Sequence, residues 1–190
     1  MSIKDSNNGS IAPPGTVIVP LPKEKEKIKA KTLSDVLLVA IRIRGNVKKT
    51  ADVKKTMGLL KLHKKHHAVL LPATKSINGM LFKVKDFIAY GIIDKPTLLR
   101  MMKKRGQLRG RRPLTEDAIK ALSPYEDFDS LADALLSLEY RYEDIKKIVP
   151  VFRLHPPKGG FPKGIKVPFA LCGVLGFHAR DINKLLTKMI

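Results

Sequence analysis

Alternation between apolar and polar residues predicts three β-strands in the first half of the chain. Residues 36–44, VLLVAIRIR, are rich in β-branched side chains and end in an alternation that places two isoleucines on one face and Arg42 and Arg44 on the other. Residues 66–71, HHAVLL, and residues 89–93, AYGII, have the length and apolar character of two further short strands.

Between these strands, apolar residues recur at the spacing of amphipathic helices. Residues 47–60 predict the first helix, and Gly58 is a natural residue to end it. The second helix, within residues 74–88, carries the most regular apolar stripe in the chain: Ile77, Met80, Leu81, Val84, Phe87 and Ile88. Gly79 interrupts that stripe, which suggests a close approach to another group. The predicted order is β-α-β-α-β across residues 33–94, and its short connections favour an α+β fold with both helices on one face of a compact sheet.

Residues 95–190 form an extension with a different charge pattern. Residues 95–112 hold eight basic residues and no acidic one, whereas residues 115–144 hold nine carboxylates and two bases. The apolar spacing in the acidic stretch predicts two short helices, at residues 116–122 and 130–139.

The remaining segments are set apart by proline, glycine and lysine. Residues 1–32 are rich in turn formers and charge, which predicts a flexible tail. Residues 152–169 are basic and rich in Pro and Gly, hence extended, with Phe152 and Phe169 expected in the core and the lysines expected to make contacts. Residues 179–190 predict a final helix.

The net charge of the chain is +20, from 37 Lys and Arg against 17 Asp and Glu. Such an imbalance repels itself in a compact fold and indicates a polyanionic partner, either nucleic acid or an anionic membrane surface. No stretch approaches the 18 apolar residues of a membrane span, so we expect no membrane association. The single cysteine excludes an internal disulfide, which favours a reducing intracellular compartment.

Three histidines in residues 61–67 raise the possibility of a metal site or an active site. His63, His66 and His67 lack a nearby carboxylate to complete or orient a metal centre, and the adjacent lysines would repel a cation. We therefore expect no metal, no cofactor, no small-molecule substrate and no catalytic residue. Cys172, six residues before a histidine, is more plausible as a packed cysteine than as a nucleophile.

Basic residues cluster around the first predicted helix. From Arg42 to Lys65 the sequence contains nine basic residues and a single acidic one, Asp52. In the predicted fold they cover one end and one flank of the β-α-β-α-β core, as expected for a surface that contacts RNA phosphates.

Residues 56–88 carry a pattern that resembles the large-subunit ribosomal protein thirty family, whose eukaryotic counterpart is called protein seven. The matching positions are Thr56, Met57, Leu60, Leu62, Lys64, His67, Val69, Met80, Leu81, Val84, Phe87 and Ile88. The segments FRLHPPKGGFPKGIKVPF and GVLGFH, with the terminal helix, are similar to the archaeal and eukaryotic branch, whose extension is absent from short bacterial members. The resemblance covers residues 33–190 and leaves the tail outside it.

The resemblance implies a ferredoxin-like antiparallel sheet of three strands and a structural, non-enzymatic role in the cytoplasm, within the large ribosomal subunit. The implied partners are large-subunit rRNA, 5S rRNA and neighbouring ribosomal proteins. The implied RNA contacts are Arg44, Lys48, Lys49, Lys55, Lys61, Lys64, Lys65, Arg153, His155, Lys158 and Lys163. To these we add His63 and His66 as neutral hydrogen-bonding groups near phosphate or sugar. Two alternatives stay open: a free RNA-binding assembly or regulatory factor, and a histidine-dependent metal nuclease.

Overall fold

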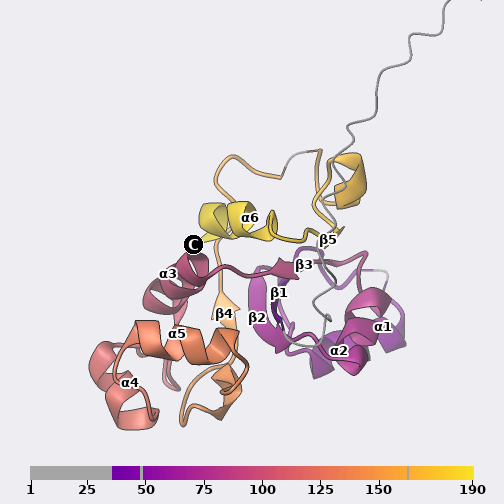
Figure 1. Ribbon diagram of the computed structural model, residues 1–190. Helices are drawn as coiled ribbons and strands as arrows, with labels where there is room; N and C mark the ends of the chain where they lie inside the picture. The colour runs from indigo at the N-terminus through magenta and orange to yellow at the C-terminus, as the bar shows by residue number, and fades with distance from the viewer. Residues whose placement is uncertain (1–35, 48, 162) are drawn as a thin grey trace, which may run out of the picture. The chain divides into compact units, whose positions relative to one another are not determined.

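The computed structural model describes residues 36–47, 49–161 and 163–190, so the predicted tail and Lys48 lie outside the described residues. The first part of the chain contains β1 (Leu37–Arg42), α1 (Ala51–Leu59), β2 (His67–Pro72), α2 (Lys75–Lys83) and β3 (Ile88–Ile92). The extension contains α3 (Lys95–Arg105), α4 (Glu116–Leu122), α5 (Phe128–Leu136), η2 (Tyr142–Asp144), β4 (Phe152–Arg153), η3 (Phe169–Leu171), β5 (Gly176–Phe177) and α6 (Ile182–Met189). The predicted α+β class and the β-α-β-α-β order are confirmed (Figure 1).

The sheet has five strands in the order β4-β2-β1-β3-β5, so the prediction of three strands was wrong. The central three, β2-β1-β3, are antiparallel as expected. β4 adds to the free edge of β2, and β5 runs parallel to β3 at the other edge. Both added strands come from the extension, and two residues are too few to show an alternating pattern in the sequence.

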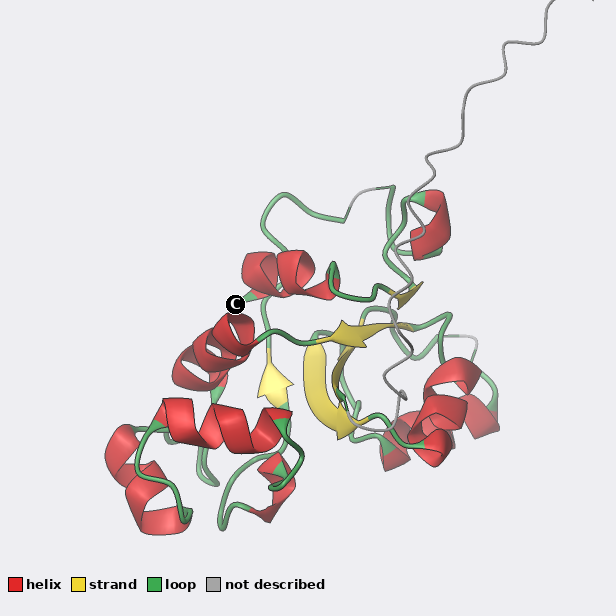
Figure 2. Cartoon of the chain, in the orientation of Figure 1, coloured by secondary structure: helices red, strands yellow, loops and turns green. Residues whose placement is uncertain are grey.

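Both faces of the sheet are covered, because every residue of β1 is buried. Leu38 and Ala40 lie in one hydrophobic cluster with residues of α1 and α2. Leu37, Val39 and Ile41 lie in a second cluster with residues of α3, α5 and α6. Successive side chains of a strand point to opposite faces, so β1 joins the predicted core to the extension (Figures 1 and 2).

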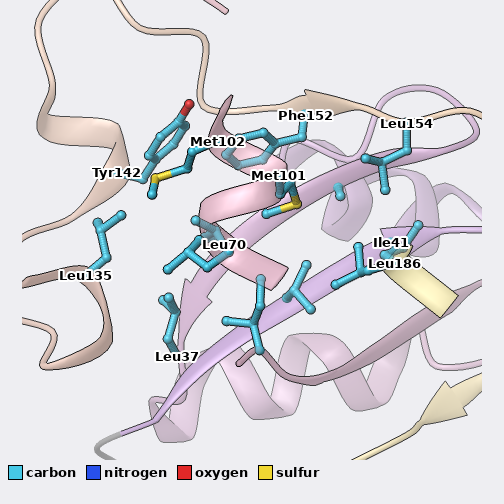
Figure 3. Packing of buried hydrophobic residues seen from close by; sticks show 14 of the residues in the cluster. Leu37, Ile41, Leu70, Met101, Met102, Leu135, Tyr142, Phe152, Leu154 and Leu186 are labelled. Atoms are coloured by element: carbon cyan, nitrogen blue, oxygen red, sulfur yellow. The ribbon is translucent and has the colours of Figure 1, made fainter. Parts of the chain in front are cut away.

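The extension face of the sheet contains the larger aromatic and sulfur-containing side chains. Phe152 of β4 is 1% exposed and its ring centroid lies 4.7 Å from that of Tyr142. Figure 3 shows these two rings beside Met102 and Met101 of α3, above Leu70 of β2. Phe152 therefore lies in the core as predicted.

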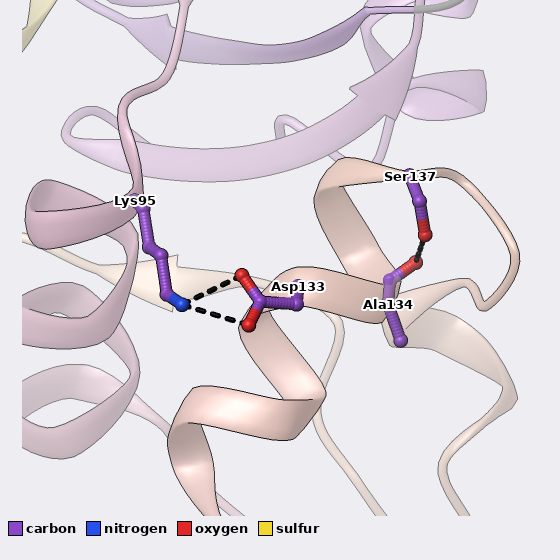
Figure 4. Close-up of polar contacts among 4 residues, drawn as sticks. All are labelled: Lys95, Asp133, Ala134 and Ser137. Atoms are coloured by element: carbon purple, nitrogen blue, oxygen red, sulfur yellow. Dashed lines mark hydrogen bonds and ion pairs between the residues drawn. The ribbon is translucent and has the colours of Figure 1, made fainter.

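The helix α3 was not assigned from the sequence. Its residues belong to a stretch that was described only by its eight basic residues, and the apolar spacing within it was not used. Lys95 at its start bonds both carboxylate oxygens of Asp133 in α5, each at 2.7 Å (Figure 4). Both side chains are largely exposed, so this pair contributes at most about 1 kcal/mol. The contact between α3 and α5 depends mainly on their buried apolar residues.

Two glycine expectations were wrong. Gly58 lies inside α1 and does not end it. Gly79 lies in α2 with nothing within 4 Å of the position that a β-carbon would occupy, so no close approach requires it. None of the helices in the described ranges combines the length and the apolar character that a membrane span requires.

Candidate nucleic-acid interface

Three loops meet at the end of the sheet where β1 finishes and β2 and β3 begin. The N–H of His66 donates to the carbonyl of Arg42 at 2.7 Å, which brings the loop before β2 against the end of β1. The N–H groups of Ile43 and Arg44 both donate to the carbonyl of Phe87, at 3.0 and 3.1 Å. Residues 43–47, 49–50, 60–66 and 84–87 therefore form one surface, which we call the loop surface.

Arg42 holds two of these loops together from within. The sequence placed it beside Arg44 on the polar face of the strand, but its side chain is only 3% exposed. Its guanidinium donates to the carbonyls of Leu62 (2.8 Å), His63 and Arg44 (3.0 Å), and to the side-chain oxygen of Asn46. Burial lowers its pKa. Arg42 thus positions the two loops, because its guanidinium binds their carbonyl oxygens and is not available to RNA.

The end of α1 positions the first lysine of the returning loop. Lys61 has φ 58°, and its N–H donates to the carbonyl of Gly58 while the N–H of Leu62 donates to that of Met57. This is the Schellman arrangement, with a lysine at the position that glycine usually occupies. The Lys61 ammonium lies 2.6 Å from Glu143. Lys61 is thus the one predicted RNA contact with an ion-pair partner among the described residues.

Lys49 is 8% exposed and lies under the loop surface. Its ammonium lies 4.4 Å from the ring centroid of Phe87 and 2.9 Å from the sulfur of Met57. Arg44 lies 5.0 Å from the same ring. Burial, followed by repulsion from Arg42 and Arg44, lowers the pKa of Lys49 to about 8. In this structure Lys49 adds positive charge beneath the loop surface, but its ammonium is too buried for direct contact with an RNA phosphate.

The histidines differ from one another in their surroundings. His63 is exposed, whereas His66 stacks on Phe161 with ring centroids 6.3 Å apart. The ring of His67 accepts a hydrogen bond from the N–H of Lys64 at 3.4 Å. Burial lowers the pKa of His67 to about 4, with further repulsion from Arg153 and three other groups. His67 is therefore neutral at pH 7. Among the described residues no three His, Cys, Asp or Glu side chains are grouped to hold a metal ion.

The extension reaches the loop surface through β4 and the loop that follows it. Arg153 pairs across the sheet with His67, and its side chain is exposed. Backbone N–H groups of His155 and Lys158 donate to the end of α6, both at 3.0 Å. Lys163 has φ 50° and is exposed. The structure thus brings Arg153 together with the core lysines and fixes His155 and Lys158 along α6, with their side chains in solvent.

Three further cations lie at this surface: Lys54 and Lys166 belong to basic stretches expected to make contacts, and Lys85 was not anticipated from the sequence. Lys54 lines a hollow with Arg42, Asn46 and His63. Lys85 and Lys166 line a second hollow of about 350 Å³ with Arg44. Lys166 comes from a distant part of the chain, and only the addition of β5 to the sheet edge places it there. Lys55 is exposed on α1, as predicted.

Two expectations about the second half of the chain were wrong. Cys172 is exposed, with φ 60°, and is not a packed cysteine. Phe169 is only partly buried, and its ring packs at a tilt of 30° against the buried ring of His178, with centroids 4.0 Å apart. Phe169 is the first residue of η3, and Cys172 directly follows this short helix.

Sequence comparisons identify relatives of this chain. A profile of the family described as Ribosomal protein L30p/L7e matches residues 38–88. The large ribosomal subunit protein uL30 of Methanoculleus marisnigri is 43% identical over 153 residues, 80% of this chain and 99% of the relative. Those of Archaeoglobus fulgidus (40% over 153 residues, 80% and 99%) and Staphylothermus marinus (42% over 159 residues, 81% and 98%) are also similar. The chain belongs to the uL30 family.

The resemblance inferred from residues 56–88 is therefore confirmed, and the relatives are archaeal, as the extension indicated. In this uL30 chain the matched segment runs from the second residue of β1 to the first residue of β3. It contains Arg42 and all three loops of the loop surface. The family pattern thus coincides with the part of the fold that builds the candidate interface.

Replacing Lys49 with methionine is expected to raise the free energy of unfolding of this uL30 chain by about 1–2 kcal/mol at pH 7. The folded pKa of about 8 lies below the ordinary lysine pKa of 10.5, so the unfolded chain binds more protons between these values. The free energy of unfolding therefore rises as the pH increases from about 8 to 10.5, because Lys49 loses its proton first in the folded state. The same contribution disappears as the pH is lowered from 10.5 to 8. Urea unfolding at pH 7 and pH 10 measures the effect: the gain from methionine should shrink at pH 10, and an equal gain at both pH values would contradict it.

Proposed function

We propose that this protein is a structural constituent of the large ribosomal subunit that binds and stabilises folded rRNA through the loop surface. The observation that carries the proposal is a set of cations from four separate segments around one end of the sheet. Of the predicted contacts described in the structure, only Lys61 has a carboxylate partner. The names of the uL30 relatives support the same assignment.

Phosphate binding follows from the chemistry of this surface. Lys64 and Lys65 are exposed, and Lys65 lies against Gly45, with its Cε 2.9 Å from where a β-carbon at that position would be. Burial lowers the pKa of both Lys49 and His67, and repulsion from neighbouring cations lowers both further, which indicates a positive potential across the surface. An RNA backbone would neutralise that potential and release counterions, and no covalent chemistry is involved.

The partners within the subunit follow from the family resemblance. We propose that the chain contacts large-subunit rRNA and neighbouring ribosomal proteins, and that it lies near 5S rRNA. Protein–RNA crosslinking in intact subunits tests this placement: crosslinks to 5S rRNA or to rRNA segments beside it are expected. Crosslinks confined to rRNA far from 5S rRNA would contradict the proposed position near 5S rRNA, but not the proposed role as a constituent of the subunit.

A free assembly or regulatory factor is the second candidate function, because the same surface would serve transient RNA binding. Sedimentation through a high-salt gradient separates the two: a constituent stays with the large subunit, and a factor is released. The metal nuclease is disfavoured by the ribosomal family membership and by the separate contacts of His66 with Phe161 and of His67 with Lys64. Stoichiometric bound zinc together with RNA cleavage would restore it.

Replacing Lys64 and Lys65 with glutamine is expected to weaken binding to large-subunit rRNA and to flatten its salt dependence. Each lost phosphate contact lowers the slope of log K against log salt by about 0.7–0.9, so a change of about 1.5 is expected. Neither lysine has an ion-pair partner among the described residues, so stability should change by less than about 0.5 kcal/mol. Filter binding across a salt series measures the slope.

The matched control removes two positive charges from helices α3 and α4 of the extension. Replacing Lys95 and Lys120 with glutamine changes the net charge equally, but Lys95 already pairs with Asp133 and Lys120 lies on α4. This variant should keep the original slope. Equal slopes for both variants would show that overall charge, and not the loop surface, drives binding.

A further inference from the structure

A second group of cations lies on a β-hairpin of the extension, which we call the arginine hairpin (residues 107–113). Gln107 and Pro113 face each other in its stem, and the N–H of Leu108 donates to the carbonyl of Arg112 at 2.8 Å. The N–H of Arg111 donates back to the carbonyl of Leu108 at 3.1 Å, with Gly110 at φ 84° and Arg111 at φ 63° at the tip. The tip sequence RGRR therefore has a defined backbone.

The hairpin is held firmly against the rest of the extension. Leu108 bridges to Ile148, and the N–H of Arg109 donates to the carbonyl of Lys147 at 2.8 Å. The N–H of Val149 donates to the carbonyl of Gln107 at 2.9 Å. Ile148 and Leu114, on either side, are buried. The cations at the tip are thus presented by a stem anchored in the hydrophobic core, and not by a loose loop.

Five exposed cations gather where these segments meet: Arg109, Arg111, Arg112, Lys146 and Lys147. None of the five forms an ion pair within the described ranges. The carboxylates that precede Lys146 are directed elsewhere: Glu143 binds Lys61, and Asp144 lies near enough to Tyr140 to contribute to its raised pKa. Among the carboxylates of the described residues, none therefore accounts for this concentration of charge.

We propose that the arginine hairpin, with Lys146 and Lys147, is a second RNA-binding surface that holds the phosphate backbone of an rRNA segment different from the one bound at the loop surface. This inference rests on the proposed rRNA-binding function and adds to it a bridging role. The loop surface is built by segments around β1, β2 and β3, whereas this surface is built by segments after α3 and after η2. One chain would then fix two RNA segments relative to each other.

RNA fits this surface better than an acidic protein does. Arginine forks bind two phosphate oxygens at once, and three arginines within four residues at a rigid tip match closely spaced phosphates along a backbone. The described tip offers no exposed aromatic or large aliphatic side chain, which a protein interface would place at its centre. The charge pattern is thus suited to sequence-independent backbone binding.

Site-directed hydroxyl-radical cleavage of rRNA in assembled large subunits tests the proposal. Cys172 is the only cysteine, so a Cys172→Ser chain accepts one new cysteine for an iron chelate. Val47→Cys reports on the loop surface, Pro113→Cys reports on the arginine hairpin, and Ala121→Cys on α4 is the matched control. All three positions are exposed and uncharged, so every cation of both surfaces is retained.

We expect the probe at position 47 to cleave one rRNA segment, the probe at position 113 to cleave a different one, and the control to stay at background. Cleavage from position 47 with background at position 113 would overturn the second surface and leave the proposed function intact. Background at both positions would overturn the proposed function itself. Cleavage of the same nucleotides from both positions would overturn the bridging role.

A binding measurement gives an independent readout. Replacing the three tip arginines with glutamine is expected to lower the salt slope for intact rRNA by about 2–3, additively with the change in Lys64 and Lys65. The stem hydrogen bonds are all between backbone groups, so the fold should be retained, which urea unfolding checks. An unchanged slope in a folded variant, or crosslinks from the tip to protein alone, would show that the hairpin binds a neighbouring protein instead.

Discussion

Replacing Arg42 with methionine is expected to lower the free energy of unfolding by about 3 kcal/mol and to weaken rRNA binding at least about tenfold. The side chain is almost fully buried and donates to three backbone carbonyls and one amide oxygen. Hydrogen bonds from a charged donor are worth about 1.5–3 kcal/mol each, and an abandoned buried acceptor costs about 1–3 kcal/mol. The removed burial cost of the guanidinium offsets part of that loss.

The effect on binding arises because Arg42 joins the loop after β1 to the loop before β2. Without it, the carbonyls of Leu62 and His63 and the side chain of Asn46 lose their common partner. The lysines on these loops would then have to be ordered when RNA binds, which lowers affinity. Urea unfolding and filter binding measure the two effects separately.

Arg44 provides the matched control, because it is two residues away, carries the same charge and is partly exposed. Replacing Arg44 with methionine should change the free energy of unfolding by less than about 1 kcal/mol. It should lower the slope of log K against log salt by about 0.7–0.9, the value for one phosphate contact. Lysine at position 42 keeps the charge but lacks the planar fork that reaches several acceptors, so it should restore little of the stability. Full recovery with lysine would show that charge alone matters there.

Replacing Gly91 with alanine is expected to cost about 3 kcal/mol of stability. A β-carbon at this position in β3 would lie 2.3 Å from the carbonyl oxygen of Ala179 and 3.0 Å from Ile182. The same carbonyl accepts a hydrogen bond from the N–H of Ile92 at 2.8 Å, so the chain before α6 has to move away and lose that bond. Overpacking against backbone atoms costs more than contact with a flexible side chain.

Gly79 is the control for this substitution. Alanine there meets nothing within 4 Å and improves helix propensity in α2, so stability should rise by about 0.5–1 kcal/mol. Thermal unfolding of both variants measures the contrast. Destabilisation of both glycine variants by the same amount would show that the packing of α6 against β3 is not the cause.

The local part of the fold could be predicted because strand and helix spacings are properties of neighbouring residues. The helix at residues 116–122 and the strands at β1, β2 and β3 were placed to within two residues of their positions in the structure. The helix expected at residues 130–139 begins earlier, at Phe128, and α3 was not assigned at all. Those errors occur in the extension, where charge runs obscure the apolar spacing.

The candidate site was predicted in kind but not in detail. The sequence indicated that basic residues around α1 would gather at one end of the sheet, and Lys55, Lys64 and Lys65 are exposed there. It could not indicate that Lys49 lies beneath Phe87, because that contact joins residues 38 positions apart. The burial of Arg42 depends on the carbonyl of Leu62, twenty residues away, and could not be predicted from the sequence for the same reason.

The sequence by itself determined the α+β class, the order of the first five elements and the resemblance to the uL30 family, and its net charge indicated a polyanionic partner. These follow from periodicity, motif spacing and net charge, which are summed along the chain and do not depend on how distant segments meet. The tertiary structure alone decided which cations are exposed, which one holds the loops, and how the extension completes both edges of the sheet. The physical reason is that burial and hydrogen-bond satisfaction are set by residues brought together from distant positions, so a basic residue becomes a ligand for RNA or for carbonyl oxygens only once its neighbours are in place.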